Sequence, residues 1–187
     1  MSTSGHPLWH AGELELACMR SSAGQTTQAR TADGDAIATS DGQGTITDGS
    51  GAVVAQAKAS FPKGSSGRLD VSDGAGTPLG SVELTSFRYG PKALKGTLVV
   101  SDASGREIGR FEARDGKGQD VAISGPGGAQ IGSLRQTGHD RGLRRSTTTY
   151  RLLLDDAGEE TVRALLVTTA LRHQALLVAA KNMRSGD

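Results

Sequence analysis

Residues 71–80 read VSDGAGTPLG, and the same order of residue types returns further along the chain. Residues 100–109 read VSDASGREIG, residues 123–132 read ISGPGGAQIG, and residues 154–158 (LDDAG) repeat the first half of the pattern. Each copy consists of the end of a strand-like run, a few small polar residues that end in a glycine, and the start of a second strand-like run. One copy is a β-hairpin, which is too small to bury its own apolar face. We therefore expect the copies to pack together.

Asp-Gly pairs mark further turns between the runs. Asp-Gly tolerates positive φ at both central positions of a two-residue hairpin turn, so each pair predicts such a turn. An alternative interpretation of the aspartates as a calcium site fails, because Ile37 and Ala38 occupy positions that an EF-hand loop needs for a ligand and a glycine. The five pairs are Asp33-Gly34, Asp41-Gly42, Asp48-Gly49, Asp73-Gly74 and Asp115-Gly116.

The runs between these turns are short and rich in strand-forming residues. Residues 67–71 and 81–84 alternate apolar and polar side chains, whereas residues 97–100 and 150–154 are more continuously apolar. About a dozen such runs fit between Leu14 and Leu154 at regular turn spacing. The pattern predicts a mainly β protein, namely a closed antiparallel barrel of about twelve strands, since closure removes exposed strand edges.

In the last part of the chain the apolar residues no longer follow the period-two pattern of strands. This change predicts one helix at about residues 159–183. Apolar residues surround this helix on all sides, which indicates burial in protein or in lipid. Its apolar run, residues 164–180, is 17 residues long, whereas a membrane span needs about 20. Arg172, His173 and Gln174 also interrupt it at its centre. We therefore favour a protein core, with the helix filling the barrel.

Composition agrees with a single glycine-rich domain. The chain has 187 residues, of which 27 are glycine and only six are aromatic, and this excludes collagen-like and coiled-coil proteins. We expect residues 1–12 to be a flexible N-terminal segment and residues 13–187 to form one domain. Because the barrel has few bulky residues of its own, the aliphatic helix is expected to supply the core.

The charge is nearly balanced overall but unevenly distributed. Residues 1–50 hold two basic and six acidic groups, whereas residues 51–151 hold fifteen basic and nine acidic groups. The middle of the chain can therefore present a basic face to an anionic partner. The sequence pI of about 7.9 lies below the value of about 9 typical of nucleic-acid-binding domains, so we expect no nucleic-acid partner.

Few residues have the chemistry of a cofactor or metal site. The single cysteine, Cys18, cannot form an internal disulfide, and with four scattered histidines it does not make a metal-binding pattern. The sequence contains no P-loop, no His-Glu-x-x-His helix and no Gly-x-Ser-x-Gly elbow. We expect no cofactor and no metal. No basic and apolar leader is recognisable at the start, so we expect a cytoplasmic protein.

Two basic clusters are the main candidate sites. Arginine suits phosphate because its planar guanidinium donates two hydrogen bonds at once, so these clusters predict an anion or phospholipid-headgroup surface. The alternative interpretation is a solvated loop that only aids solubility. The candidate contacts are Arg135, Arg141, Arg144 and Arg145 in one segment and Lys92 and Lys95 in the other.

The polar triplet inside the predicted helix is a second candidate site. A buried charge needs a partner, or it destabilises the fold by several kcal/mol. Arg172, His173 and Gln174 therefore either bind carbonyl or acidic groups inside the barrel as a structural link, or line a water-filled pocket that accepts a small ligand.

A hairpin-repeat barrel followed by one apolar helix resembles the tubby C-terminal-like superfamily, which includes tubby domains, phospholipid scramblases and LURP-one-related proteins. The resemblance rests on the turns at residues 73–80 and 102–109 and on the helix at residues 161–180. It implies about twelve strands around a central hydrophobic helix, and the glycine-rich hairpins are most similar to a small bacterial member of the LURP-one-related type. Scramblase members carry clustered cysteines and an acidic calcium segment, whereas this chain has only Cys18.

The resemblance implies a non-enzymatic binding or scaffold module that contacts anionic phospholipid headgroups or a protein partner, in the cytoplasm or peripherally at the inner membrane face. Two other hypotheses remain at this stage. The chain is a structural or assembly component of a larger complex, or it has scramblase-like activity or an enzymatic site that no motif reveals.

Overall fold

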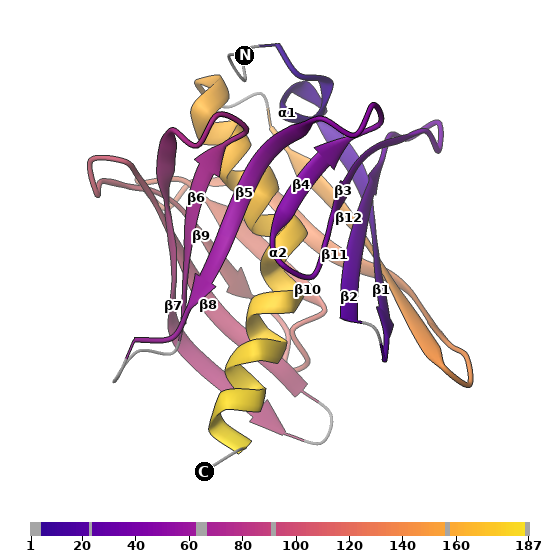
Figure 1. Ribbon diagram of the computed structural model, residues 1–187. Coiled ribbons are helices and arrows are strands. Elements are labelled where there is room, and N and C mark those ends of the chain that lie inside the picture. The colour runs from indigo at the N-terminus through magenta and orange to yellow at the C-terminus, as the bar shows by residue number, and fades with distance from the viewer. Residues whose placement is uncertain (1–4, 23, 63–66, 91–92, 156–157, 186–187) are drawn as a thin grey trace.

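The chain folds as a closed antiparallel β-barrel around one long helix, as Figure 1 shows. The computed structural model describes residues 5–22, 24–62, 67–90, 93–155 and 158–185. Every strand pairs with its neighbours in chain order, and β1 closes the barrel by pairing with both β2 and β12. The twelve strands are β1 (Glu13–Ser21), β2 (Gly24–Arg30), β3 (Ala36–Ser40), β4 (Thr45–Asp48), β5 (Val53–Ser60), β6 (Arg68–Asp73), β7 (Pro78–Gly90), β8 (Ala93–Asp102), β9 (Glu107–Ala113), β10 (Asp120–Ser124), β11 (Gln130–Arg141) and β12 (Arg145–Leu154). The fold class predicted from the sequence is confirmed.

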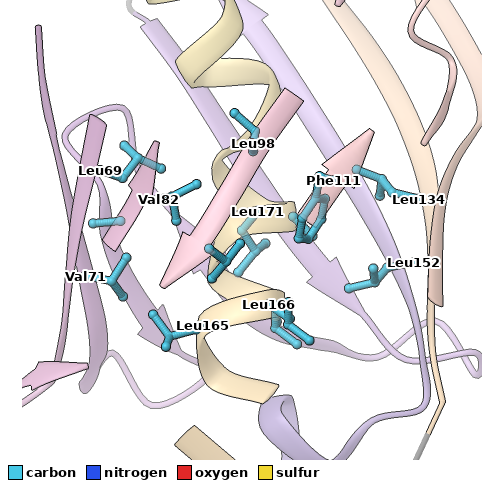
Figure 2. Close-up of a cluster of buried hydrophobic side chains, with 14 of the residues drawn as sticks. Leu69, Val71, Val82, Leu98, Phe111, Leu134, Leu152, Leu165, Leu166 and Leu171 are labelled. Carbon is cyan, nitrogen blue, oxygen red and sulfur yellow. The ribbon is translucent and has the colours of Figure 1, made fainter. Parts of the chain in front are cut away.

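The helix α2 (Glu160–Ser185) runs through the inside of the barrel. Its aliphatic side chains are buried on several sides, and Leu165, Leu166 and Val167 are all at most 1% exposed. Figure 2 shows Leu165, Leu166 and Leu171 of the helix among inward-facing side chains from strands on both sides. The segment Glu160–Met183 is long and apolar enough to cross a bilayer, but 72% of its most apolar window is buried inside the barrel. That burial is typical of a core helix.

Part of the N-terminal segment, for which flexibility was predicted over residues 1–12, packs against the barrel, while residues 1–4 lie outside the described residues. Pro7–His10 form the short helix α1, and Leu8 and Trp9 are completely buried in the core. Arg163 of α2 holds this segment in place, because its guanidinium donates hydrogen bonds to the backbone carbonyls of Trp9 and Ala11 at 2.6 and 2.9 Å. Apolar burial and these bonds order a segment that sequence composition alone does not mark as structured.

The turns at the Asp-Gly pairs differ from the predicted two-residue type. At Asp73, the backbone N–H bonds the carbonyl of Thr77, and the N–H of Gly76 bonds the carbonyl of Asp73. This is a three-residue loop whose positive φ, +88°, falls on Gly76 rather than on the glycine that follows the aspartate. The Asp73 carboxylate accepts from the N–H groups of Ala75 and Thr77, which is why an aspartate begins the loop. Among the five Asp-Gly glycines, only Gly34 has positive φ.

The two ends of the barrel differ. The turns that follow β2, β4, β6, β8 and β10 lie at the end where α2 begins, and we call this the turn end. The opposite end, where β1 and β11 finish, β12 begins and α2 finishes, is called the mouth.

Candidate anion-binding site

The inner face of β1, β12 and β11 changes from apolar to cationic toward the mouth. Residues in register across these three strands form rows, and alternate rows face the interior. The deepest row consists of three leucines, and the next rows become progressively more polar. In order, the rows are Leu14–Leu152–Leu134, Leu16–Tyr150–Gln136, Cys18–Thr148–His139 and Arg20–Ser146–Arg141.

A β-bulge between Gln136 and Gly138 decides which basic side chains join this inner face. Without the bulge, Arg135 and Arg141 would point to the same side, because their numbers differ by an even value. The extra residue in β11 reverses the alternation. Arg135 therefore lies opposite Arg151 on the outer face and pairs with Asp120 at 3.3 Å, whereas Arg141 turns toward the interior of the mouth.

An inner cavity of about 480 Å³ lies between this wall and the C-terminal half of α2. Four cationic side chains line it, namely Arg20, Lys117, Arg141 and Lys181, and no carboxylate is among its described lining residues. Amide and hydroxyl groups cover much of the remaining wall. Such a cavity offers hydrogen-bond donors and positive charge, which suits an anionic group.

Tyr150 is the most deeply placed polar residue of this wall. Its side chain is only 4% exposed, and its hydroxyl has no hydrogen-bond partner among the described residues. Burial raises the pKa of the Tyr150 hydroxyl, so it stays protonated and can donate. Tyr150 lines the inner cavity, so its hydroxyl is available to a group that enters there.

A second, shallower hollow of about 340 Å³ opens beside the cavity. Arg20 and Arg141 line both spaces, and Arg144 and Arg145 from the β11–β12 hairpin complete the outer one. None of these four arginines forms an ion pair with a carboxylate of the described residues. We call Arg20, Arg141, Arg144 and Arg145 the basic mouth.

The structure brings together only part of the basic surface predicted from the sequence. Arg141, Arg144 and Arg145 meet at the outer hollow, but Arg135 lies on the outer wall in an ion pair. Lys95, on β8, is half-buried and lines neither space. The remaining predicted contact, Lys92, lies outside the described residues.

The predicted interior triplet divides into different roles. Arg172 is 6% exposed and donates from Nη1 to the backbone carbonyl of Asp41 at 2.7 Å, which is the geometry of a structural link. His173 is buried against Phe111, and burial lowers its pKa to about 4, so its imidazole is neutral. Gln174 lines the inner cavity. Arg172 also lines a separate hollow of about 430 Å³ beside the helix, so this residue takes part in the structural link and borders a pocket as well.

Sequence reasoning missed Arg20, Lys117, Gln136 and Tyr150. Arg20 and Tyr150 are about 130 positions apart in the sequence, and only the closure of the barrel through β1 and β12 makes them neighbours. The available signal was weak: Arg20 is the one cation in the strand 13–21 and stands at its end.

Comparison with protein-family models, with curated proteins and with solved structures finds no match to this chain. Among the described residues, no group of three or more His, Cys, Asp or Glu side chains is placed to hold a metal ion. The site is therefore interpreted from its own geometry.

Proposed function

We propose that this protein is a non-enzymatic binding module, of tubby-like or LURP-one-related type, that docks on anionic phospholipid surfaces at the cytoplasmic face of a membrane. The observation that carries the proposal is the basic mouth. Four arginines from β1 and the β11–β12 hairpin surround one hollow without a described carboxylate partner. Guanidinium groups gathered in this way favour phosphate.

The opposite end of the barrel supports one orientation on such a surface. Asp48 and Asp102 begin two of the turns there, and the pKa of each carboxyl is lowered, chiefly by a hydrogen bond from the hydroxyl of Ser50 or Ser104. Both therefore remain ionised at neutral pH. An anionic membrane attracts the basic mouth, whereas the turn end offers it the Asp48 carboxylate and an Asp102–Arg106 ion pair at 3.1 Å, which provide no such attraction.

The expected affinity is modest. Each Lys or Arg near an anionic membrane contributes about 1 kcal/mol, so four arginines give about 4 kcal/mol. That value corresponds to a dissociation constant near 1 mM. Electrostatic attraction of this size is strongly reduced by salt, because the Debye length falls from about 30 Å at 0.01 M to about 10 Å at 0.1 M.

Cosedimentation with vesicles tests the proposal. Wild-type protein is expected to sediment with phosphatidylcholine vesicles that contain phosphatidylserine at low salt, and not with pure phosphatidylcholine. Reversing the charge of Arg144 and Arg145 to Glu should lower the bound fraction at least tenfold, since two attractive groups become repulsive.

The matched control reverses Arg135 and Arg151 to Glu, which changes the net charge by the same amount on the outer wall. This control is expected to keep most of the binding. If wild-type protein fails to sediment, or if both double variants lose binding equally, docking through the basic mouth is refuted.

A further inference from the structure

Leu143 lies at the tip of the β11–β12 hairpin, which carries three of the four arginines of the basic mouth. The N–H of Gly142 bonds the carbonyl of Arg145 at 2.9 Å, so Leu143 and Arg144 form the tip between them. Leu143 has a relative exposure of 106%, whereas the other large exposed apolar side chains of the described residues range from 37% to 58%. In Figure 1 this hairpin, in orange, projects away from the barrel wall at the end where α2 finishes.

Nothing in the fold accounts for a leucine at this position. A fully exposed side chain buries no area on folding, so Leu143 contributes no apolar stabilisation to the barrel. The hairpin tip does not require an apolar residue either, since small and polar residues are the usual choice in turns. An exposed leucine taken singly is ordinary on a protein surface. Its placement beside Arg141, Arg144 and Arg145 is what needs an explanation.

A bilayer explains both kinds of residue together. Peripheral membrane proteins combine an apolar side chain, which enters the boundary between headgroups and acyl chains, with cations that remain at the phosphates. Charge complementarity favours an anionic bilayer as the occupant of this surface, because its phosphates lie directly above an apolar acyl-chain layer, in the same arrangement as the arginines around Leu143.

We propose that Leu143 inserts into the acyl-chain boundary of an anionic bilayer while Arg144 and Arg145 bind the surrounding phosphates. This inference rests on the proposed function and specifies its partner as an intact lipid surface rather than a free anion. It also supplies the second contribution that stable membrane attachment requires in addition to electrostatic attraction.

A tryptophan reporter tests insertion directly. The only natural tryptophan, Trp9, is completely buried at the turn end and gives a constant background. In Leu143→Trp, phosphatidylserine-containing vesicles should shift the added emission to the blue, and lipids brominated on their acyl chains should quench it. Val53, 39% exposed at the start of β5 near the turn end, provides the control variant Val53→Trp, whose emission should not change.

A second variant measures the contribution to affinity. Leu143→Asp removes the apolar group and adds a negative charge, so binding to the same vesicles should weaken at least about tenfold. Val53→Asp makes the same change at the opposite end and should leave binding within about twofold. Circular dichroism should give unchanged melting for Leu143→Asp, because Leu143 is fully exposed.

The outcomes separate the two proposals. If wild-type protein sediments with anionic vesicles but Leu143→Trp is neither shifted nor quenched, the insertion is refuted and electrostatic docking stands. If wild-type protein does not sediment at all, both proposals fail. Binding of wild-type protein to soluble inorganic phosphate with an affinity equal to that for vesicles would also overturn the specific role of the bilayer.

Discussion

Arg172, at the centre of the core helix, donates a hydrogen bond from its guanidinium to the backbone carbonyl of Asp41, 131 residues earlier in the chain, at 2.7 Å. Burial lowers the pKa of this guanidinium, and the nearby Asp41 partly opposes the shift. The bond joins α2 to the loop between β3 and β4. A charged group inside an aliphatic helix is thus used to fix the position of the helix within the barrel.

Replacing this arginine should therefore destabilise the fold. In Arg172→Met the apolar stem is kept but the charge-assisted bond is lost, and we expect a loss of about 1–3 kcal/mol. For a chain of this size that corresponds to a melting temperature lower by roughly 2–10 °C. Gln174→Met is the matched control on the same helix, because Gln174 lines the cavity and is expected to tolerate the change. Equal melting of both variants would refute the structural role of Arg172.

The link between Arg163 and α1 has an optical readout. Arg163→Met leaves the carbonyls of Trp9, Ala11 and Asp155 without their donor, and we expect a loss of about 2–4 kcal/mol. Trp9 should become more accessible, so its fluorescence maximum should shift to the red. Arg151→Met, which removes an exposed pair with Glu13, should leave emission unchanged and stability within about 0.5 kcal/mol. An unshifted maximum in Arg163→Met would show that packing alone holds α1.

His173 predicts a specific dependence of stability on pH. Its pKa is about 4 in the folded protein, owing to burial, against about 6.5 when unfolded. Between these two values the unfolded chain binds a proton that the native protein does not. The contribution of the neutral His173 imidazole to the free energy of unfolding is therefore fully present above pH 6.5 and is lost as the pH falls toward 4. The total loss is about 3 kcal/mol.

Urea unfolding at pH 7.5 and pH 5 measures this contribution. His173→Gln should flatten the decline seen for the wild-type protein by about 2 kcal/mol over that interval. A decline in His173→Gln equal to that of the wild-type protein would mean that other groups cause it.

Gly44 and Gly51 show two different reasons why a hairpin turn needs glycine, namely backbone conformation and lack of space for a side chain. Both have positive φ, but a Cβ on Gly51 would meet open space, whereas a Cβ on Gly44 would overlap the carbonyl oxygen of Ala57. Gly51→Ala should lose only about 1–2 kcal/mol through backbone conformation. Gly44→Ala must also displace β5, to which the carbonyl of Gly44 is bonded at 2.8 Å, and should lose at least about 3 kcal/mol. Chemical unfolding of the two variants measures the difference, and equal losses would contradict the steric argument.

The sequence by itself determined the barrel and its central helix. Runs of period two separated by glycine turns admit few structures other than an antiparallel sheet, and the number of runs favours closure. Apolar side chains lie on every side of the helix between Thr161 and Ala180, so burial was the stable arrangement available to this helix in water. Local pattern was sufficient because these features depend on neighbours within a few positions along the chain.

The site was decided by tertiary structure. The alternation of side chains in a strand places Arg135 with Arg141, and only the bulge at residues 136–138 of the folded sheet separates them. Arg20 joins Arg141 because both lie in register with Ser146, a relationship that exists only after β1 has paired with β12. The sequence also predicted where the turns lie but not their geometry. Asp73 begins its loop as an aspartate should, but the glycine with positive φ is Gly76 rather than Gly74. Local periodicity fixes which residues form strands, whereas long-range register fixes which side chains meet.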